Sequence, residues 1–285
     1  MKKAAIVTDT TSCIPPVKVQ EYGIEVVPVP LIIEGKTYRD GIDITPEQFY
    51  DRMRKAKKAP STSASAPEPY LEAFEKAVKK AAGIICFTEP ARFSAMYISA
   101  TIAMKTAASS LSGTRIEVIE GTTAAAGMGL VALEAACAAD AGKTFEEVKA
   151  AAIDVMQKTR LYAALDTLQY LVRSGRVPQV AALVNSILSI KPVFTLNNDG
   201  AKTVALPRTM KGAIEKMFRL VQQGATKDQP LHVAVMHADA LPNATALKER
   251  IEAGCNCREI YITEFTPVMG AHTGPGLVGV TFWGE

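Results

Sequence analysis

Strand and helix segments alternate through the first half of the chain, and this alternation constrains the fold more than any other feature. Short apolar segments typical of strands lie at 4–7, 24–33, 83–88 and 115–119. Segments with helical character lie at 45–57, 67–81, 94–110, 122–141 and 145–158. Parallel strands need a long crossover between them, usually a helix, so this order predicts a mostly parallel sheet.

The pattern changes near residue 160. Strands are expected at 162–165, 191–196, 203–205, 232–237, 260–266 and 277–283. Helices are expected at 166–174, 180–188, 209–223 and 242–253. Asn197-Asn198-Asp199-Gly200 predicts a hairpin turn, so the sheet of this half should be mixed or antiparallel. We therefore expect an α/β protein with two domains, residues 1–158 and 159–285.

Composition and charge exclude several classes of function. The chain has 285 residues and a net charge of +3, from 32 basic and 29 acidic residues, which is too balanced for a nucleic-acid-binding surface. No apolar segment is long enough to cross a membrane, and Met1-Lys2-Lys3 leads into a strand without a secretory signal. The five scattered cysteines suit reduced thiols. We expect a cytoplasmic protein that neither binds nucleic acid nor inserts stably into membranes.

Nucleotide and metal sites are not expected either. Gly127-Met128-Gly129 begins a match to the dinucleotide-binding motif, but it falls inside a predicted helix and not in the turn that the motif requires. Small residues packed in a helix explain it better. His232 and His237 are five residues apart on a predicted strand and so face opposite sides. The sequence thus predicts no metal and no cofactor.

The segment 266–280 is rich in glycine and proline and contains His272, which Gly270, Gly274 and Gly276 surround. Glycine permits positive φ and close approach of the backbone, so we expect a loop between two strands. Such a loop holds a side chain at the mouth of a site, and imidazole donates or accepts near neutral pH. The alternative is a plain turn whose histidine is incidental.

Neutral hydroxyl groups gather in two other places. Thr62 and Ser63 are expected in a loop before a helix, and Ser94 at the start of the next helix. Hydroxyls and free amides at helix starts can hold a carboxylate, although ordinary helix capping would also explain them. An acyl hydrolase or transferase that uses Ser94 and His272 is a second possibility, even without a Gly-x-Ser-x-Gly motif.

Several ordered motifs together resemble the DegV family of bacterial fatty-acid-binding proteins over essentially the whole chain. The motifs are Asp9-Thr10-Thr11-Ser12-Cys13-Ile14-Pro15, the Thr-Ser segment 60–65, the helix start 93–100, and the segments 166–176, 188–200 and 272–276. The resemblance implies two α/β domains with a long-chain fatty acid in the cleft between them.

The resemblance also implies residue roles and a partner. The carboxylate of the fatty acid would be held by Thr62, Ser94 and His272. Ser63, Arg176, Arg208 and Gly274 would be additional contributors, the arginines near the domain junction or the surface that faces the partner. Proteins of the family present the acyl group to a separate fatty acid kinase and are not themselves catalysts, so no cofactor is expected beyond the bound lipid.

The sequence departs from the family pattern in three places. Ala64 stands where glutamine is usual, Ala95-Met96 replace Gly-Thr, and Glu120-Gly121 replace Asp-Ser. We expect the first two to reshape the head-group site or alter chain preference while leaving the three proposed donors in place.

Overall fold

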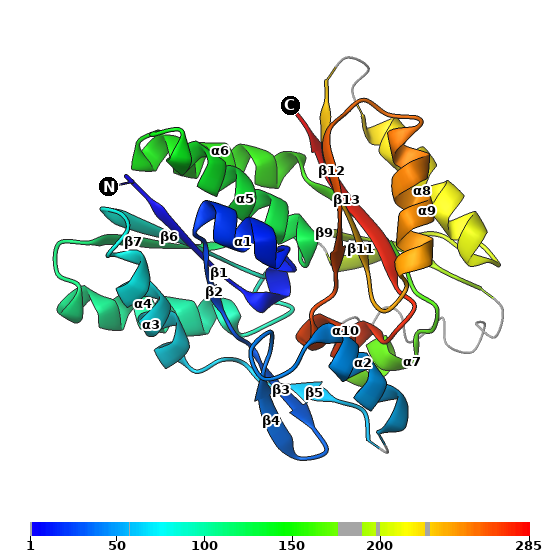
Figure 1. The fold of residues 1–285 in the computed structure, drawn as a ribbon, viewed down its shortest axis with the longest axis horizontal. Coiled ribbons are helices and arrows are strands. Elements are labelled where there is room, and N and C mark those ends of the chain that lie inside the picture. Colours follow the sequence, from blue (N-terminus) through cyan, green and yellow to red (C-terminus); the bar gives the residue numbers. More distant parts are fainter. Residues whose placement is uncertain (1, 57, 176–189, 198–199, 226–228) are drawn as a thin grey trace.

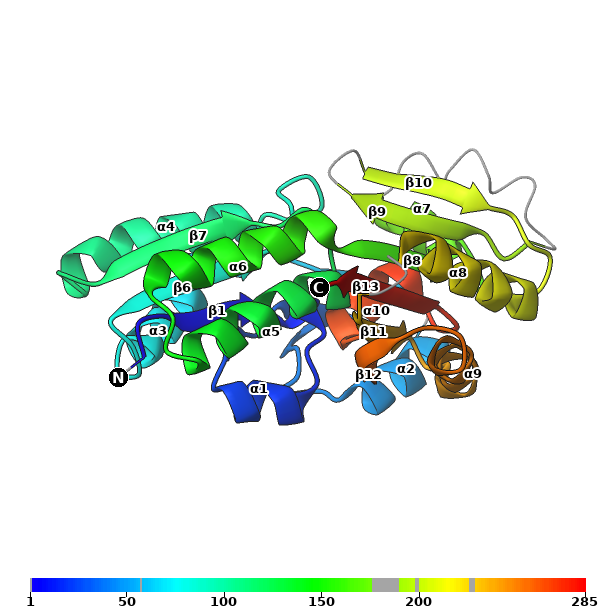
Figure 2. The same cartoon turned by 90° about the horizontal axis from the view of Figure 1, so that it is seen from above.

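The structure is a computed structural model and describes residues 2–56, 58–175, 190–197, 200–225 and 229–285. Two large sheets lie side by side, one built from the N-terminal part of the chain and the other from the C-terminal part (Figure 1 and Figure 2). This arrangement confirms the expected α/β class with a parallel and a mixed sheet.

The N-terminal part contains a four-stranded parallel sheet in the order β2-β1-β6-β7. Its strands are β1 (Ala5–Asp9), β2 (Glu25–Val27), β6 (Gly83–Thr88) and β7 (Arg115–Glu120). Helices α3 (Pro67–Ala77) and α4 (Met96–Ser110) cover one face, and α1 (Pro16–Tyr22), α5 (Ala126–Asp140) and α6 (Phe145–Lys158) cover the other (Figure 2). Successive strand residues face opposite sides of the sheet. Because helices cover both sides, most strand residues are apolar whichever side they face.

Helix α5 begins later than expected and lies very close to the turn after β1. Gly127 and Gly129 are in the helix, as the sequence indicated, and both are buried. A Cβ atom at Gly129 would lie 2.5 Å from the backbone oxygen of Ser12. The glycine pair therefore permits close packing of helix and turn.

The C-terminal part contains a six-stranded mixed sheet in the order β10-β9-β8-β13-β11-β12. Its strands are β8 (Arg160–Ala164), β9 (Val193–Asn197), β10 (Gly200–Ala205), β11 (Leu231–His237), β12 (Cys257–Glu264) and β13 (Val278–Gly284). Only β11 and β12 run parallel among these neighbours. Helices α8 (Met210–Gly224) and α9 (Leu241–Glu252) pack on one face. The short α7 (Gln169–Ser174) follows β8.

The expected hairpin is present, because Asn197 pairs with Gly200 across β9 and β10. Its two central residues, Asn198 and Asp199, and the helix expected at 180–188 lie outside the described residues.

A small third sheet corrects two expectations. The segment 24–33 is not one strand: β2 belongs to the parallel sheet, whereas β3 (Pro30–Ile33) pairs with β4 (Lys36–Arg39) and β5 (Ser61–Thr62). Pro28 and Pro30 lack the amide hydrogen that a continuous ladder requires, which explains the break. Thr62 is therefore held by strand pairing and not by a loop. Helix α2 (Pro46–Lys55) follows β4.

The glycine-rich segment near the C-terminal end is also not the expected loop. Residues Pro267–Thr273 form a helix, α10, with Pro267 at its first position. A Cβ atom at Gly270 would lie 2.5 Å from the Tyr50 hydroxyl oxygen, and Gly274 ends the helix with φ of 72°. The glycines serve helix packing and helix termination, and only the turn after Thr273 is a loop.

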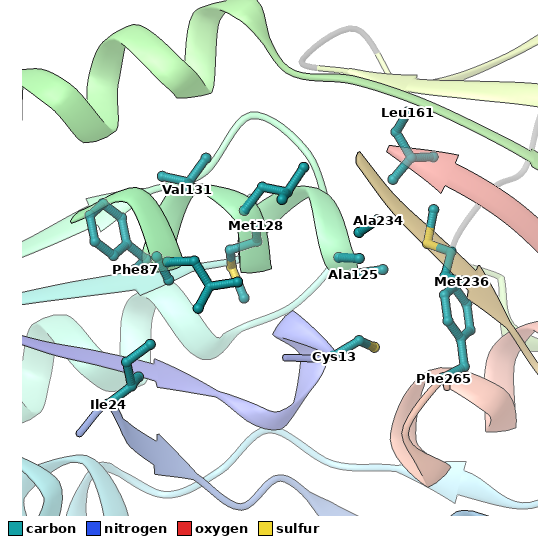
Figure 3. Packing of buried hydrophobic residues seen from close by; sticks show 14 of the residues in the cluster. Cys13, Ile24, Phe87, Ala125, Met128, Val131, Leu161, Ala234, Met236 and Phe265 are labelled. Atoms are coloured by element: carbon teal, nitrogen blue, oxygen red, sulfur yellow. The ribbon is translucent and has the colours of Figure 1, made fainter. Parts of the chain in front are cut away.

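One hydrophobic core joins the two parts of the chain. It contains Met128 and Val131 of α5 together with Ala234 and Met236 of β11 (Figure 3). The domain boundary expected near residue 158 falls between α6 and β8, and its position stays a prediction. Within the described residues, no helix combines the length and the hydrophobicity that a membrane span requires.

Candidate functional site

An apolar cavity of about 250 Å³ lies between the parallel sheet and the mixed sheet. The mixed sheet contributes Leu161, Ala163 and Met236 to its wall, and the start of α5 contributes Ala125. Figure 3 shows the side chains of Leu161 and Met236 near Ala125. Most other lining residues are also aliphatic, aromatic or methionine: Val29, Ala64, Phe93, Ala95, Met96, Ala124, Leu165, Leu171, Phe194, Leu196, Ala201, Phe265, Val268, Met269 and Leu277. Such a wall suits a hydrocarbon.

Two of the expected carboxylate ligands meet in this cavity. The Thr62 hydroxyl oxygen lies 2.9 Å from Nε2 of His272, and both residues line the wall. Thr62 is placed by the pairing of β5 with Leu31 of β3, and His272 by the last turn of α10. Thr62 and His272 are 210 residues apart in the sequence, and packing of α10 against the small sheet brings them together.

Ser94 lines the same cavity from a different element. Its hydroxyl oxygen accepts a hydrogen bond from the amide of Met96 at the start of α4, at 3.3 Å. The N-cap residue of α4 is Ala95, so Ser94 precedes the cap, bonds the first amide of the helix and also borders the cavity. Ser63 borders it as well.

A hydrolytic arrangement would bring Ser94 and His272 together. The hydrogen bond described for the His272 ring instead joins it to Thr62. This bond makes the His272 ring a polar contact of the cavity wall together with Thr62.

The remaining expected contributors have different positions. Gly274 ends α10, and a Cβ atom there would lie 2.1 Å from the Tyr170 ring. Arg208 is exposed and does not line the cavity. Arg176 lies outside the described residues.

Four polar residues of the wall were not expected from the sequence: Thr11, Glu89, Thr195 and Thr273. Glu89 is only 5% exposed and follows β6 directly. A polar residue after a buried strand marks the carboxyl edge of a parallel sheet, where ligands bind in α/β folds, and this signal was available in the sequence.

A buried carboxyl group supports the turn behind Thr11. Asp9 accepts hydrogen bonds from the Thr11 amide at 2.9 Å and from the Tyr70 hydroxyl at 2.8 Å. Burial raises the pKa of Asp9, whereas these hydrogen bonds oppose the increase. Asp9 thus fixes the shape of this edge of the cavity.

The three departures from the family pattern divide between the wall and its surroundings. Ala64, Ala95 and Met96 line the cavity, so the first two departures lie in its wall, and their effect on its shape stays a prediction. Glu120 accepts a hydrogen bond from the Ala91 amide and so shapes the segment before α4. Among the described residues, no group of three metal-ligating side chains comes together.

Comparisons with known proteins identify the family. The model of the family described as "Uncharacterised protein, DegV family" matches residues 3–285. A DegV domain-containing protein from Caldanaerobacter subterraneus subsp. tengcongensis is 32% identical over 287 residues, which cover 99% of each chain.

Two solved structures have the same fold over their full length. The structure titled "Fatty Acid Binding of a DegV family Protein from Thermus thermophilus" has a TM-score of 0.91 and 25% identity, covering 100% of both chains. The crystal structure of DegV, a fatty acid binding protein from Bacillus subtilis, has a TM-score of 0.88 and 26% identity. It also covers 100% of both chains. The match of the family model to nearly the whole sequence confirms the resemblance found in its motifs: the chain belongs to the DegV family.

Proposed function

We propose that this protein binds a long-chain fatty acid, with the alkyl chain in the apolar cavity and the carboxylate beside Thr62, Ser94 and His272. The observation that supports this most is the Thr62–His272 hydrogen bond inside a cavity that is otherwise mostly apolar. Fatty acid binding by structural relatives of the same family supports it further.

The energetics of the cavity suit such a ligand. Each buried methylene contributes roughly 0.8 kcal/mol, so a dozen contribute on the order of 10 kcal/mol before the cost of association. The hydroxyls and the imidazole then need only orient the carboxylate and offset the loss of its hydration. Ser63 is a further donor in this proposal, and Gly274 fixes the end of the helix that carries His272.

We further propose that the bound acyl group is presented to a separate fatty acid kinase in the cytoplasm, and that the chain itself is not a catalyst. Arg176 and Arg208 would then belong to the surface that the kinase meets. A reconstituted reaction with purified kinase and ATP tests this step. Acyl phosphate, trapped with hydroxylamine, is expected only when the lipid-loaded protein is present, whereas equal product without it would refute the presentation step.

Native mass spectrometry of protein purified from bacteria tests the binding proposal. We expect a population heavier by the mass of one fatty acid. The variant Ala163→Phe, which fills the cavity from β8, should lose that population while keeping a cooperative thermal transition. A wild-type protein that carries no lipid, and takes up none when fatty acid is added, would overturn the proposal.

An esterase assay tests the hydrolase alternative. Wild type and Ser94→Ala should hydrolyse a chromogenic acyl ester at the same background rate. A rate that depends on the Ser94 hydroxyl would instead favour the enzyme.

A further inference from the structure

Helix α10 carries His272, which is proposed to contact the lipid head group, and packs closely against its neighbours at Gly270 and Gly274. Its side chains Val268, Met269, His272 and Thr273 line the cavity. Gly270, in its middle, packs so closely that a Cβ atom there would lie 2.9 Å from the Phe49 ring, and its far end abuts the Tyr170 ring at Gly274. The remaining support is at its first turn.

Asp40 provides that support. Its side chain is fully buried, at 0% exposure, and Oδ2 accepts a hydrogen bond from the amide of Val268 at 3.3 Å. The other oxygen, Oδ1, has no hydrogen-bond partner among the residues that the structure describes. The hydroxyl group of Thr266, the residue before α10, donates to the backbone oxygen of Thr10 at 3.0 Å. This bond links the start of α10 to the turn after β1.

We infer that Asp40 is a positioning residue for the lipid head group: its carboxylate holds the first turn of α10 and thereby keeps His272 beside Thr62. Val268 and His272 are four residues apart, so about 6 Å of helix separates the anchor from the imidazole. A shift at the first turn is therefore transmitted directly to the ring. The inference rests on the proposed function, because it assigns a role within the same site.

The charge on Asp40 has opposite effects on stability and on positioning. Burial raises the pKa of Asp40 from 3.8 to about 6 and the Asp9 carboxylate adds to this increase, whereas the hydrogen bond from the Val268 amide opposes it. Because the folded state favours the protonated form, stability contributed by Asp40 is complete below pH 3.8 and declines as the pH rises through about 6. Ionisation, however, strengthens the hydrogen bond from Val268.

Among the residues that the structure describes, no cation is a main influence on the pKa of Asp40. The titratable groups whose pKa values its charge raises are the Cys13 thiol and the Tyr50 phenol, and Asp9 is the acidic neighbour. Above pH 6 a charged Asp40 thus destabilises the fold while holding α10. A residue with a purely structural role would not separate the two effects.

The variant Asp40→Asn tests the inference, since it keeps the shape and an acceptor but removes the charge. At pH 7.5 we expect a thermal midpoint equal to or above that of wild type, together with fatty acid affinity weaker by about five- to tenfold. The difference in affinity should disappear near pH 5, where wild-type Asp40 is protonated. Other pH-dependent contributions to binding are common to both proteins and cancel in the comparison.

Asp43→Asn is the matched control, because Asp43 lies three residues away and pairs with exposed Arg39 at 3.0 Å. It should leave fatty acid affinity unchanged. The inference is overturned if Asp40→Asn lowers the thermal midpoint and also lowers the affinity by a factor that does not change with pH. It is also overturned if Asp40→Asn binds fatty acid with wild-type affinity.

Hydrogen exchange of the lipid-free protein separates this inference from the proposed function. At one fixed pH of 7.5, amides of α10 should exchange several-fold faster in Asp40→Asn than in wild type, with α5 unchanged. This result supports the anchor even if no fatty acid binds. Equal protection of α10 in both proteins would refute the anchor whatever the ligand.

Discussion

At the scale of single residues, the site depends on neutral donors placed in an apolar wall. Thr62 and His272 are within hydrogen-bonding distance, and Ser94 borders the same cavity from α4. Neutral donors hold a carboxylate without leaving a buried cation when the site is empty, which would be costly in such surroundings.

Replacing Thr62 with valine should weaken fatty acid binding. The change keeps the shape of the side chain and removes one hydrogen bond to a charged group, which is worth about 1.5–3 kcal/mol, or roughly 10- to 150-fold in affinity. Isothermal titration of delipidated protein measures the effect. Thr37→Val, at an exposed position of the same small sheet, should bind as wild type does; equal affinities for both variants would remove Thr62 from the site.

The sequence indicated the residues that line the site better than it indicated the buried carboxyl groups around them. The resemblance to the family implied Thr62, Ser94 and His272 as carboxylate ligands, and all three line the cavity, whereas the residue pattern alone left helix capping and an incidental histidine open. Asp40 and Glu89 were not expected, because a carboxylate in a loop is usually solvated and only tertiary packing buries it.

At the scale of elements, α10 and the turn after it determine where the imidazole lies. The sequence predicted a loop here because glycine and proline are strong loop signals. The prediction was wrong because Pro267 is at a favourable first helical position, and Gly270 is required by the close approach of Tyr50. Close approach of two distant segments is not visible in local sequence.

Gly274→Ala should destabilise the protein and weaken lipid binding together. The position has φ of 72°, and the new Cβ atom would lie 2.1 Å from the Tyr170 ring. We expect a loss of about 2–4 kcal/mol in the free energy of unfolding, measured with urea. Gly142→Ala has a similar φ of 78° but open space around the Cβ position, so it should cost only about 1 kcal/mol. Equal costs would show that contact with Tyr170 is unimportant.

At the scale of the whole molecule, a polar network supplements the shared core in joining the two parts of the chain. Lys18 of α1 pairs with Glu259 of β12 at 2.9 Å, and His232 contacts Glu259 at 3.1 Å and Glu285 at 3.0 Å. The His232 ring also stacks on Trp283, with centroids 4.2 Å apart. The alternation of strands and helices predicted the two sheets, but it contained no information about this contact between them.

This network predicts a dependence of stability on pH. Burial lowers the pKa of His232, but hydrogen bonds from its ring to Glu259 and Glu285 outweigh burial and raise it above 6.5. The stability that protonated His232 contributes is therefore complete below pH 6.5 and is lost as the pH rises through the raised value.

Chemical unfolding at pH 6 and at pH 8.5 measures this contribution. Wild type should lose up to about 1 kcal/mol more than His232→Phe, which can still stack on Trp283. Lys248→Met, which removes an exposed pair within α9, should follow wild type. A loss of the same size in His232→Phe and wild type would contradict the assignment.

The crystal structure of the protein with a bound fatty acid tests the central claim most directly. We predict an alkyl chain that runs along Leu161 and Met236, with a carboxylate oxygen about 3 Å from the Thr62 hydroxyl or from Nε2 of His272. A carboxylate at the opposite end of the cavity, or a ligand bound elsewhere while the cavity remains empty, would contradict the account.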